Sequence, residues 1–456
     1  MTDKHRRTAK VLDMTEGNSM RLIIAFAIPL FIGSIFQQVY TLVDTMIVGH
    51  VLGAHAISAI GSTSSIHALM FNIAICLNNG FAIITTQAFG AHDDQKLRHS
   101  VAGMFVLNIA ATVLLTTIAL LFLRPMMHFM NTPEAIFEEA YRYVLILFLG
   151  LFSTAGYNMF AGILRAVGNS RTPLYCLIVS SLVNIVLDIL LVAVIPMGVA
   201  GAALATVIAQ IVSMVLCGAA FFRNYKDMIP KREEYRSSVK LWPSMLSAGA
   251  AMALMLCVVN IGSIIFQRAN NGLGEKLIAA HTASYRVVIN LMQPLSTLAT
   301  ACSTFVSQNW GAEKYDRIKR TMRNVMGLSA LWGCISIGIV FLWGRWLVWL
   351  ITGTEDAYIM ENAVLNMRCV AVGLPALGVL LCLRTSMQSM GRKVAPVLSS
   401  CVELLMKSVG AFLLIPAYGF LGSSLTDPLT WFSMSFFLII AYLIQRKHIY
   451  PQEEGA

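Results

Sequence analysis

Twelve apolar runs, each long enough to cross a lipid bilayer, take up most of this chain. A hydrocarbon core of about 30 Å requires about 20 apolar residues in a helix. Hydrophobic residues make up 57% of the sequence and charged residues 12%, which is outside the range of soluble proteins. We therefore predict an all-α membrane protein with twelve transmembrane helices and no soluble domain. The runs lie near 21–48, 56–86, 99–123, 138–164, 173–195, 200–222, 241–267, 277–306, 321–350, 358–386, 395–416 and 421–445.

The second half of the chain repeats the first. The segment QAFGAHDDQKLR at 87–98 returns as QNWGAEKYDRIK at 308–319, 221 residues later, and Gly198 recurs as Gly419 at the same distance. Each copy holds six apolar runs, an even number, so both copies enter the membrane from the same side. We expect a pseudo-twofold axis along the membrane normal to relate them. Duplication of a multi-span unit is the usual construction of secondary transporters, with the substrate path between the copies.

The repeat divides the chain into two six-helix lobes. The only extended charged run inside the chain separates them, and we interpret it as a solvated cytoplasmic loop. The first twenty residues are polar and basic, and no cleaved signal peptide is predicted. The predicted divisions are a cytoplasmic tail at 1–20, an amino-terminal lobe at 21–224, a cytoplasmic linker at 225–240, a carboxyl-terminal lobe at 241–445 and a cytoplasmic tail at 446–456.

The net charge of +10 reflects membrane topology rather than a surface for nucleic acid. With a cytoplasmic amino terminus, 24 of the 33 Lys and Arg residues fall in cytoplasmic tails and loops. This positive-inside asymmetry predicts that both termini are cytoplasmic, and no nucleic-acid partner is expected. All nine cysteines lie in apolar runs without a CxxC pair, so we predict no disulfide, no metal site and no cofactor.

Two carboxylates of the amino-terminal lobe indicate an ion site. A carboxylate at membrane depth is costly, so it normally faces a cavity or a partner. Asn184 precedes Asp188 by one helical turn, while Thr206 and Asp44 lie at similar depths, so we predict that all four meet in the outer-leaflet half of the lobe. Their oxygens suit a small cation, and the two carboxylates could instead carry protons. The alternative is an interhelical hydrogen-bond cluster that fixes packing.

Two further acidic residues well inside spans belong to the carboxyl-terminal lobe. Glu403 lies one helical turn from Lys407, and Asp427 occupies the position that matches Thr206 of the first copy. We predict an internally compensated set of Glu403, Lys407 and Asp427. Two interpretations remain, a structural ion-pair network and a substrate or gating contact.

Further polar residues in the amino-terminal lobe are candidates for coupling and for substrate binding. Pro29 lies inside the first span, about 15 residues before Asp44, where a proline makes a bend in the helix. Such a bend could couple ion binding to transport or could be static. A central substrate cavity could be lined by Gln37, Tyr40, Tyr157 and Asn158. The alternative interpretation is that these side chains form local helix–helix hydrogen bonds.

Several segments carry a family resemblance. They are FQQVYTLVDTMIVGHVLG at 36–53, TQAFGA at 86–91 with SQNWGA at 307–312, LRAVGNSRTP at 164–173 and NIVLD at 184–188. In this order they resemble the MATE family, the multidrug and toxic compound extrusion transporters. The resemblance covers nearly the whole chain, and its first segment is the most specific.

The resemblance implies a V-shaped antiporter of twelve helices in two lobes, which exports organic cations and drugs against an inward gradient of Na⁺ or H⁺. In family members with a cation site in the amino-terminal lobe, the ligands match Asp44, Asn184, Asp188 and Thr206, and the bending proline matches Pro29. The spacing of these positions fits the DinF-like branch. Other branches have acids in the seventh and tenth spans, and here those spans have no acid well inside the membrane.

We expect a monomeric multidrug antiporter in the inner or plasma membrane of a bacterium or archaeon, with organic cations and the lipid bilayer as its partners. A transported Na⁺ would bind at Asp44 and Asp188. The alternative is a flippase of the same superfamily for lipid-linked sugars or lipids, with Arg286, Arg384 and Lys407 lining a cationic cavity. No HExxH, GxSxG or phosphate-loop motif occurs in a suitable context, so no enzymatic activity is predicted.

Overall fold

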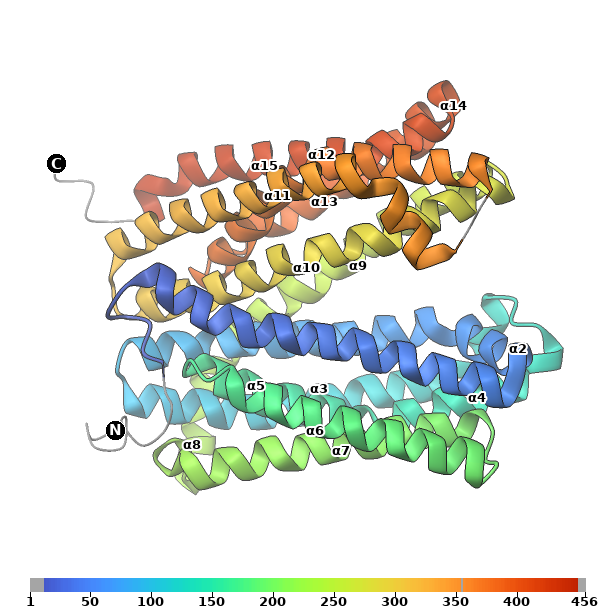
Figure 1. Ribbon diagram of the computed structural model, residues 1–456. Helices are drawn as coiled ribbons and strands as arrows, with labels where there is room; N and C mark the ends of the chain where they lie inside the picture. Colours follow the sequence, from blue (N-terminus) through green and yellow to red (C-terminus); the bar gives the residue numbers. More distant parts are fainter. Residues whose placement is uncertain (1–11, 354–355, 450–456) are drawn as a thin grey trace. The chain divides into compact units, whose positions relative to one another are not determined.

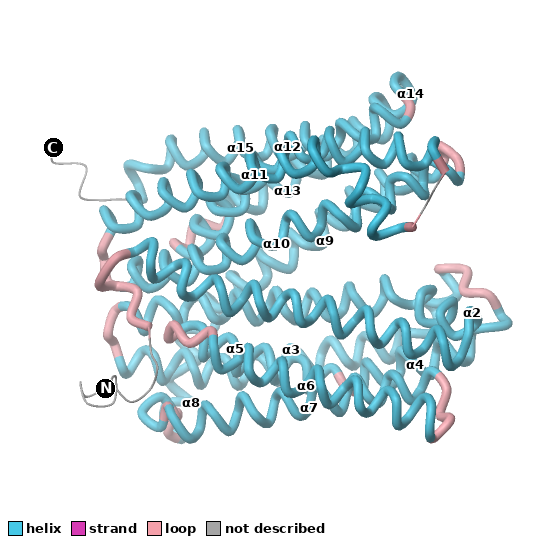
Figure 2. The backbone as a smooth tube through the Cα atoms, viewed as in Figure 1, coloured by secondary structure: helices cyan, strands magenta, loops and turns pink. Residues whose placement is uncertain are grey.

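The computed structural model describes residues 12–353 and 356–449, and helices are the only regular elements of this described chain (Figures 1 and 2). The helices form two compact units. Within the described chain, the first unit contains 12–14 and Ile28–Ala253, and the second contains Thr15–Ala27 and 254–449. Parts of the predicted tails, 1–11 and 450–456, lie outside the described residues.

The first unit is built mainly from six membrane-length helical segments. The 72 residues of α2 form two spans, which a kink at Gly53, with φ 80°, separates. Helices α4 and α5 together make one span that is interrupted at Gly150. The elements are α2 (Ser19–Gly90), α3 (Asp94–Phe129), α4 (Glu134–Leu149), α5 (Leu151–Ala166), α6 (Arg171–Asp188), the π-helical turn η1 (Ile189–Val194), α7 (Val199–Asn224), η2 (Lys226–Met228), α8 (Arg232–Ser237), η3 (Ser238–Leu241) and the first part of α9 (Trp242–Asn271).

The second unit contains the first turns of α2, the end of α9 and the remaining helices. Helix α12 packs between α10, α11 and α15 and supplies many of the buried residues of this unit. The further elements are α10 (Glu275–Gly311), α11 (Tyr315–Thr352), α12 (Ala357–Ser389), α13 (Val394–Val409), the π-helical turn η4 (Gly410–Leu414), α14 (Ile415–Tyr418) and α15 (Phe420–Ile449).

Eleven helical segments of the described chain are long and apolar enough to cross a membrane, and the chain is a multi-pass membrane protein. The twelfth predicted span, 277–306, forms α10, which has 37 residues and therefore the length to cross. It is not among the eleven because polar side chains such as Arg286, Asn290 and Gln293 interrupt its apolar sequence.

The sequence duplication extends to the backbone. A π-helical turn precedes Gly198 in the first half and Gly419 in the second. Both glycines have positive φ, a conformation that glycine adopts without the steric penalty of a Cβ atom, and both begin the next helix after a tight turn. Ten of the eleven residues with positive φ in the described chain occur in matching pairs, namely Gly53 with Gly274, His92 with Glu313, Asn131 with Gly353, Gly168 with Gly391, and Gly198 with Gly419.

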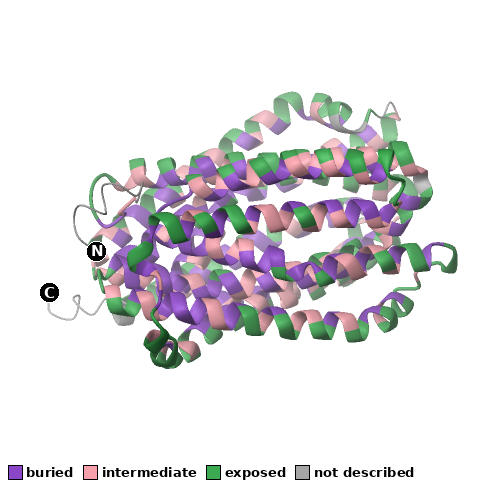
Figure 3. Ribbon diagram, turned by 90° about the horizontal axis from the view of Figure 1, so that it is seen from below, coloured by how far each residue is buried: buried purple, intermediate pink, exposed green. Residues whose placement is uncertain are grey.

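The helices pack through only part of their surface. In the first unit, Phe81, Met104 and Phe221 belong to one buried apolar cluster. Figure 3 shows buried and exposed residues alternating along the helices. Large apolar side chains such as Leu121 and Leu342 are 70% and 73% exposed, which is the pattern expected where a helix faces lipid rather than water.

Candidate ion site

The centre of the candidate site is a pair of carboxyl groups in the first unit. Asp44 on α2 and Asp188 at the end of α6 lie within hydrogen-bonding reach of one another. Asp188 is fully buried, and neither of its oxygens accepts a hydrogen bond from a donor elsewhere in the described chain. Two carboxyl groups can bond to one another only when one of them carries a proton. The pair therefore requires a compensating proton or cation.

Local backbone geometry places Asp188 at this point. It is the last α-helical residue before the π-helical turn η1, which widens the helix by one residue. Such turns change the direction in which side chains project and are frequent at functional sites. Asn184 lies one turn earlier on the same helix, is 2% exposed, and neither polar atom of its amide has a hydrogen-bond partner within 12–353 and 356–449.

A small cavity adjoins Asn184 and is walled by α2, α6 and α7. The hydroxyl of Thr206 faces it and donates to the carbonyl of Ala202 at 3.1 Å, which leaves its oxygen lone pairs available. The volume of about 10 Å³ is room for one water molecule or a small ion. The lining residues are Tyr40, Leu177, Ser180, Ser181, Asn184, Thr206, Ala209 and Gln210.

The four predicted ligands thus fall into two adjoining pairs. Asp44 and Asp188 contact one another, whereas Asn184 and Thr206 line the neighbouring cavity. Buried polar atoms normally have hydrogen-bond partners, so several unpartnered oxygens close together indicate a missing water or ion. In the described chain, Asp44, Asn184 and Asp188 each contribute at least one such oxygen.

Sequence reasoning missed three kinds of residue at this site. Gln210 lies one turn after Thr206 and presents a buried, unpartnered Oε1 atom near the cavity. Ser180 and Ser181 lie one turn before Asn184, so the same helical spacing could have identified all three residues. Tyr143 on α4 lies near both carboxyl groups, and no spacing in the sequence connects it with them.

The predicted substrate-cavity residues have different surroundings. Tyr40 lines the cavity and bonds to the side chain of Gln37. Tyr157 donates to the carbonyl of Pro173 at 3.5 Å, and Asn158 donates to that of Thr154 at 2.9 Å. The bond of Tyr157 joins α5 to α6 and matches the helix–helix alternative, whereas the bond of Asn158 stays within α5.

The predicted coupling residue Pro29 lies within a regular stretch of helix. Helix α2 continues through Pro29, and its one residue with non-helical dihedral angles is Gly53. A bend at Pro29 therefore stays a prediction.

In the second unit, two of the three residues predicted to compensate one another, Glu403 and Lys407, form an ion pair. The Nζ atom of Lys407 lies 3.5 Å from Glu403 and donates to Ser263 at 2.8 Å. Asp427 makes no ion pair with Lys407 within the part of the chain that the structure describes. The reason is helical phase, because Thr426 is the side chain that packs on Gly410, and the next residue projects about 100° away. Asp427 instead lies near His281 and Tyr285.

Comparisons with known proteins agree with the fold and with the duplication. The MatE family model matches residues 29–190 and again 251–413, in the two halves of the chain. The probable multidrug resistance protein YoeA of Bacillus subtilis is 27% identical over 354 residues, covering 76% of each chain. The DNA damage-inducible protein F of Escherichia coli is 24% identical over 362 residues, covering 77% of this chain and 76% of that protein.

Solved structures of similar fold extend over nearly the whole chain. A crystal structure of MATE in the bent conformation has a TM-score of 0.87 at 19% identity and covers 100% of this chain and 99% of its own. An outward-facing multidrug resistance MATE family transporter of the MOP superfamily has a TM-score of 0.88 at 18% identity, with 98% and 99% covered.

Proposed function

Because this chain belongs to the MatE family, we propose that it is a secondary antiporter that exports organic cations and drugs in exchange for Na⁺ or H⁺. The names of its relatives, among them multidrug resistance and multidrug export proteins, support this substrate class. The observation that carries the proposal is the buried pair of Asp44 and Asp188, which needs a positive charge to be stable.

In this proposal the pair is the exchange site of the coupling ion. The ion enters from the outside, where its concentration is high, and neutralises the repulsion between the two carboxylates. Asn184 and Thr206 add neutral oxygens, which are the ligands that Na⁺ accepts and that a protonated carboxyl can bond. The same site can therefore serve either ion.

Ion binding is coupled to the drug through α2. This helix carries both Asp44 and Pro29, and Tyr40 of the same helix lines the cavity beside Asn184. Drawing Asp44 toward the ion repositions α2, and Pro29 provides the place at which the helix bends because it lacks a backbone N–H. The change in the amino-terminal lobe, 21–224, releases the drug outside.

The proposal includes the membrane topology. The protein lies as a monomer in an inner or plasma membrane with both termini in the cytoplasm, and 225–240 is the cytoplasmic link to the carboxyl-terminal lobe, 241–445. The asymmetric distribution of Lys and Arg supports this orientation.

Uptake of a fluorescent organic cation into everted membrane vesicles tests the function. The vesicles come from cells that lack other drug pumps, and Na⁺ or H⁺ is concentrated in the lumen in separate experiments. We expect uptake that follows one gradient and is lost in Asp188→Asn. The exposed Glu275→Gln is the matched control for loss of one carboxylate. Uptake by Asp188→Asn at the wild-type rate would contradict the proposed ion site, and a wild type that is inactive under both gradients would contradict the drug antiporter.

A further inference from the structure

A second cavity, far larger than the one beside Asn184, lies within the second unit. It has a volume of about 510 Å³, which is in the range of sites for small organic ligands. One wall is the start of α2 and the two residues before it, and the other wall is the first turns of α11. The lining residues are Gly17, Asn18, Ser19, Met20, Asp316, Arg317, Arg320 and Asn324.

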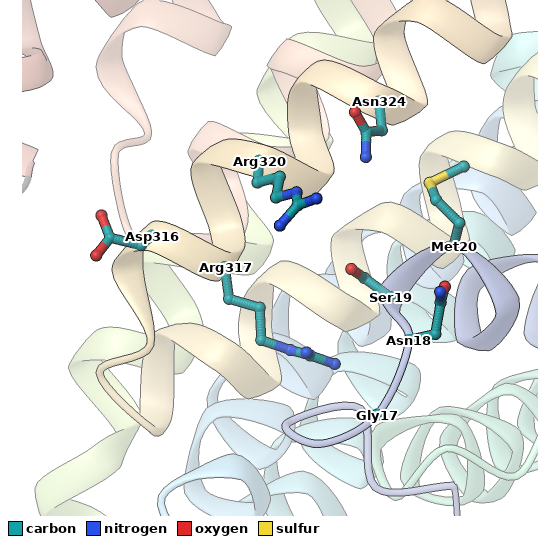
Figure 4. A pocket seen from close by; sticks show the side chains of 8 residues that line it. All are labelled: Gly17, Asn18, Ser19, Met20, Asp316, Arg317, Arg320 and Asn324. Carbon is teal, nitrogen blue, oxygen red and sulfur yellow. The ribbon is translucent and has the colours of Figure 1, made fainter.

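The side chains give this cavity a positive character. Figure 4 shows the guanidinium groups of Arg317 and Arg320 directed toward the segment that begins α2, whereas Asp316 points away from it. Asp316 instead forms an ion pair with Lys319 at 3.5 Å. Two planar guanidinium groups that converge on one space are suited to a phosphate, because each can donate two parallel hydrogen bonds to its oxygens.

The opposite wall is held in place. Lys314 donates to the carbonyl of the buried Thr15 at 2.9 Å, which ties the segment before α2 to the loop before α11. Gly17 has a φ of +80°, and the side chain of Asn18 caps α2 by accepting from the N–H of Arg21 at 3.1 Å. The N–H group of Leu22 donates to the carbonyl of Asn18 at 3.1 Å, and the positive end of the helix dipole adds to the preference for an anion.

Apolar side chains lead away from the cavity along both helices. Ile24 lies one turn after Met20 on α2 and is 42% exposed. On α11, Leu331 and Ile335 lie two and three turns after Asn324 and are 57% and 46% exposed. A phosphate held by the arginines would therefore have exposed apolar surface beside it, as the headgroup and acyl chains of a phospholipid require.

We propose that this cavity binds the phosphate headgroup of an anionic phospholipid from the cytoplasmic leaflet. The leaflet follows from the proposed topology, in which the starts of α2 and α11 lie on the cytoplasmic side, and the inference does not depend on which drug or ion is transported. The bound lipid holds the first turn of α2 against α11.

Binding of a short-chain phosphatidylglycerol to the purified full-length protein in neutral detergent tests the site. We expect the lipid to raise the melting temperature of the wild type, and the Arg317→Gln/Arg320→Gln variant to bind it at least about tenfold more weakly. Arg323→Gln, an exposed arginine of the same helix that does not line the cavity, is the matched control and should bind like the wild type. Arg320→Lys keeps the charge but loses the forked geometry, so it should be intermediate.

Two comparison ligands and two single variants provide further tests of the lipid site. Inorganic phosphate and short-chain phosphatidylcholine are the comparison probes, since one lacks acyl chains and the other lacks net charge. If inorganic phosphate binds as tightly as the lipid and depends on the same arginines, the ligand of the site is free phosphate, and the lipid proposal is wrong. Lipid binding that is unchanged in folded Arg320→Gln, or lost equally in Arg323→Gln, would overturn the site. A wild type that shows no binding would overturn it as well.

Discussion

The carboxyl groups of Asp44 and Asp188 lie against one another in the first unit, and Asp188 is completely buried. Two negative charges at this separation repel strongly in a low-dielectric environment. The site is therefore stable only when a proton or a cation neutralises one charge, and its occupancy depends on the ion supply on the open side of the membrane. This dependence is what an antiporter needs in order to connect an ion gradient with transport.

Replacing Asp44 or Asp188 by asparagine should abolish ion-coupled export without preventing folding. We predict that Asp44→Asn and Asp188→Asn fold normally and melt at or above the wild-type temperature, because each removes a buried negative charge and keeps the shape. Both should lose drug export. Melting of the detergent-purified variants together with export assays checks this. A variant that exports fully, or one that cannot fold, would count against an ion-exchange role for the pair.

Gln210 provides a test of the neighbouring cavity. Its Oε1 atom is buried and has no hydrogen-bond partner in the described chain, which is unfavourable by roughly 1–3 kcal/mol unless water or an ion completes it. We predict that Gln210→Leu keeps or gains stability but needs a higher concentration of the coupling ion for half-maximal export. An unchanged ion dependence would show that Gln210 does not contribute to the ion site.

The role of the ion pair between Glu403 and Lys407 can be tested by removing one charge and then both. Lys407→Met should destabilise the protein by roughly 3–5 kcal/mol, because it leaves the buried Glu403 without its partner. The double variant with Glu403→Gln should recover most of this loss. If the pair is structural, the double variant also exports drug. A stable double variant without export would instead indicate a substrate or gating contact.

Helices α2 and α9 meet at two glycines of the first unit. A Cβ atom at Gly80 would collide with the backbone of Gly249, which cannot move aside as a flexible side chain could. We predict that Gly80→Ala destabilises the protein by roughly 1–3 kcal/mol. The control is Gly327→Ala on α11, where an added Cβ meets nothing within 4 Å. Equal melting temperatures for the two variants would contradict this close contact.

The sequence predicts the parts of this architecture that follow from spacing and repetition. Asn184 and Asp188 share a helix face because they are four residues apart, and the pairing of Gly198 with Gly419 is visible as a repeat. Side-chain direction around a helix is harder to predict when the partner helix is unknown. The spacing alone therefore assigns Asp427 to Lys407, although Thr426 is the residue that packs on Gly410 of η4.

Two features of the ion site cannot be predicted from local sequence patterns. The π-helical turn η1 begins immediately after Asp188, and its sequence, ILLVAV, does not distinguish it from an ordinary apolar helix. Tyr143 reaches the carboxyl pair from α4, which is distant in the sequence from both acids. Such contacts require the arrangement of the helices within the unit.

Ion binding by the purified protein is the most direct test of the central claim. In weakly buffered detergent solution, addition of a transported organic cation should release protons from a proton-coupled wild type. A Na⁺-coupled wild type should instead bind radioactive Na⁺, and the drug should displace it. We predict one of these two signals in the wild type and in Glu275→Gln, and neither in Asp188→Asn. A signal of wild-type size in folded Asp188→Asn would place the coupling ion elsewhere and contradict the account.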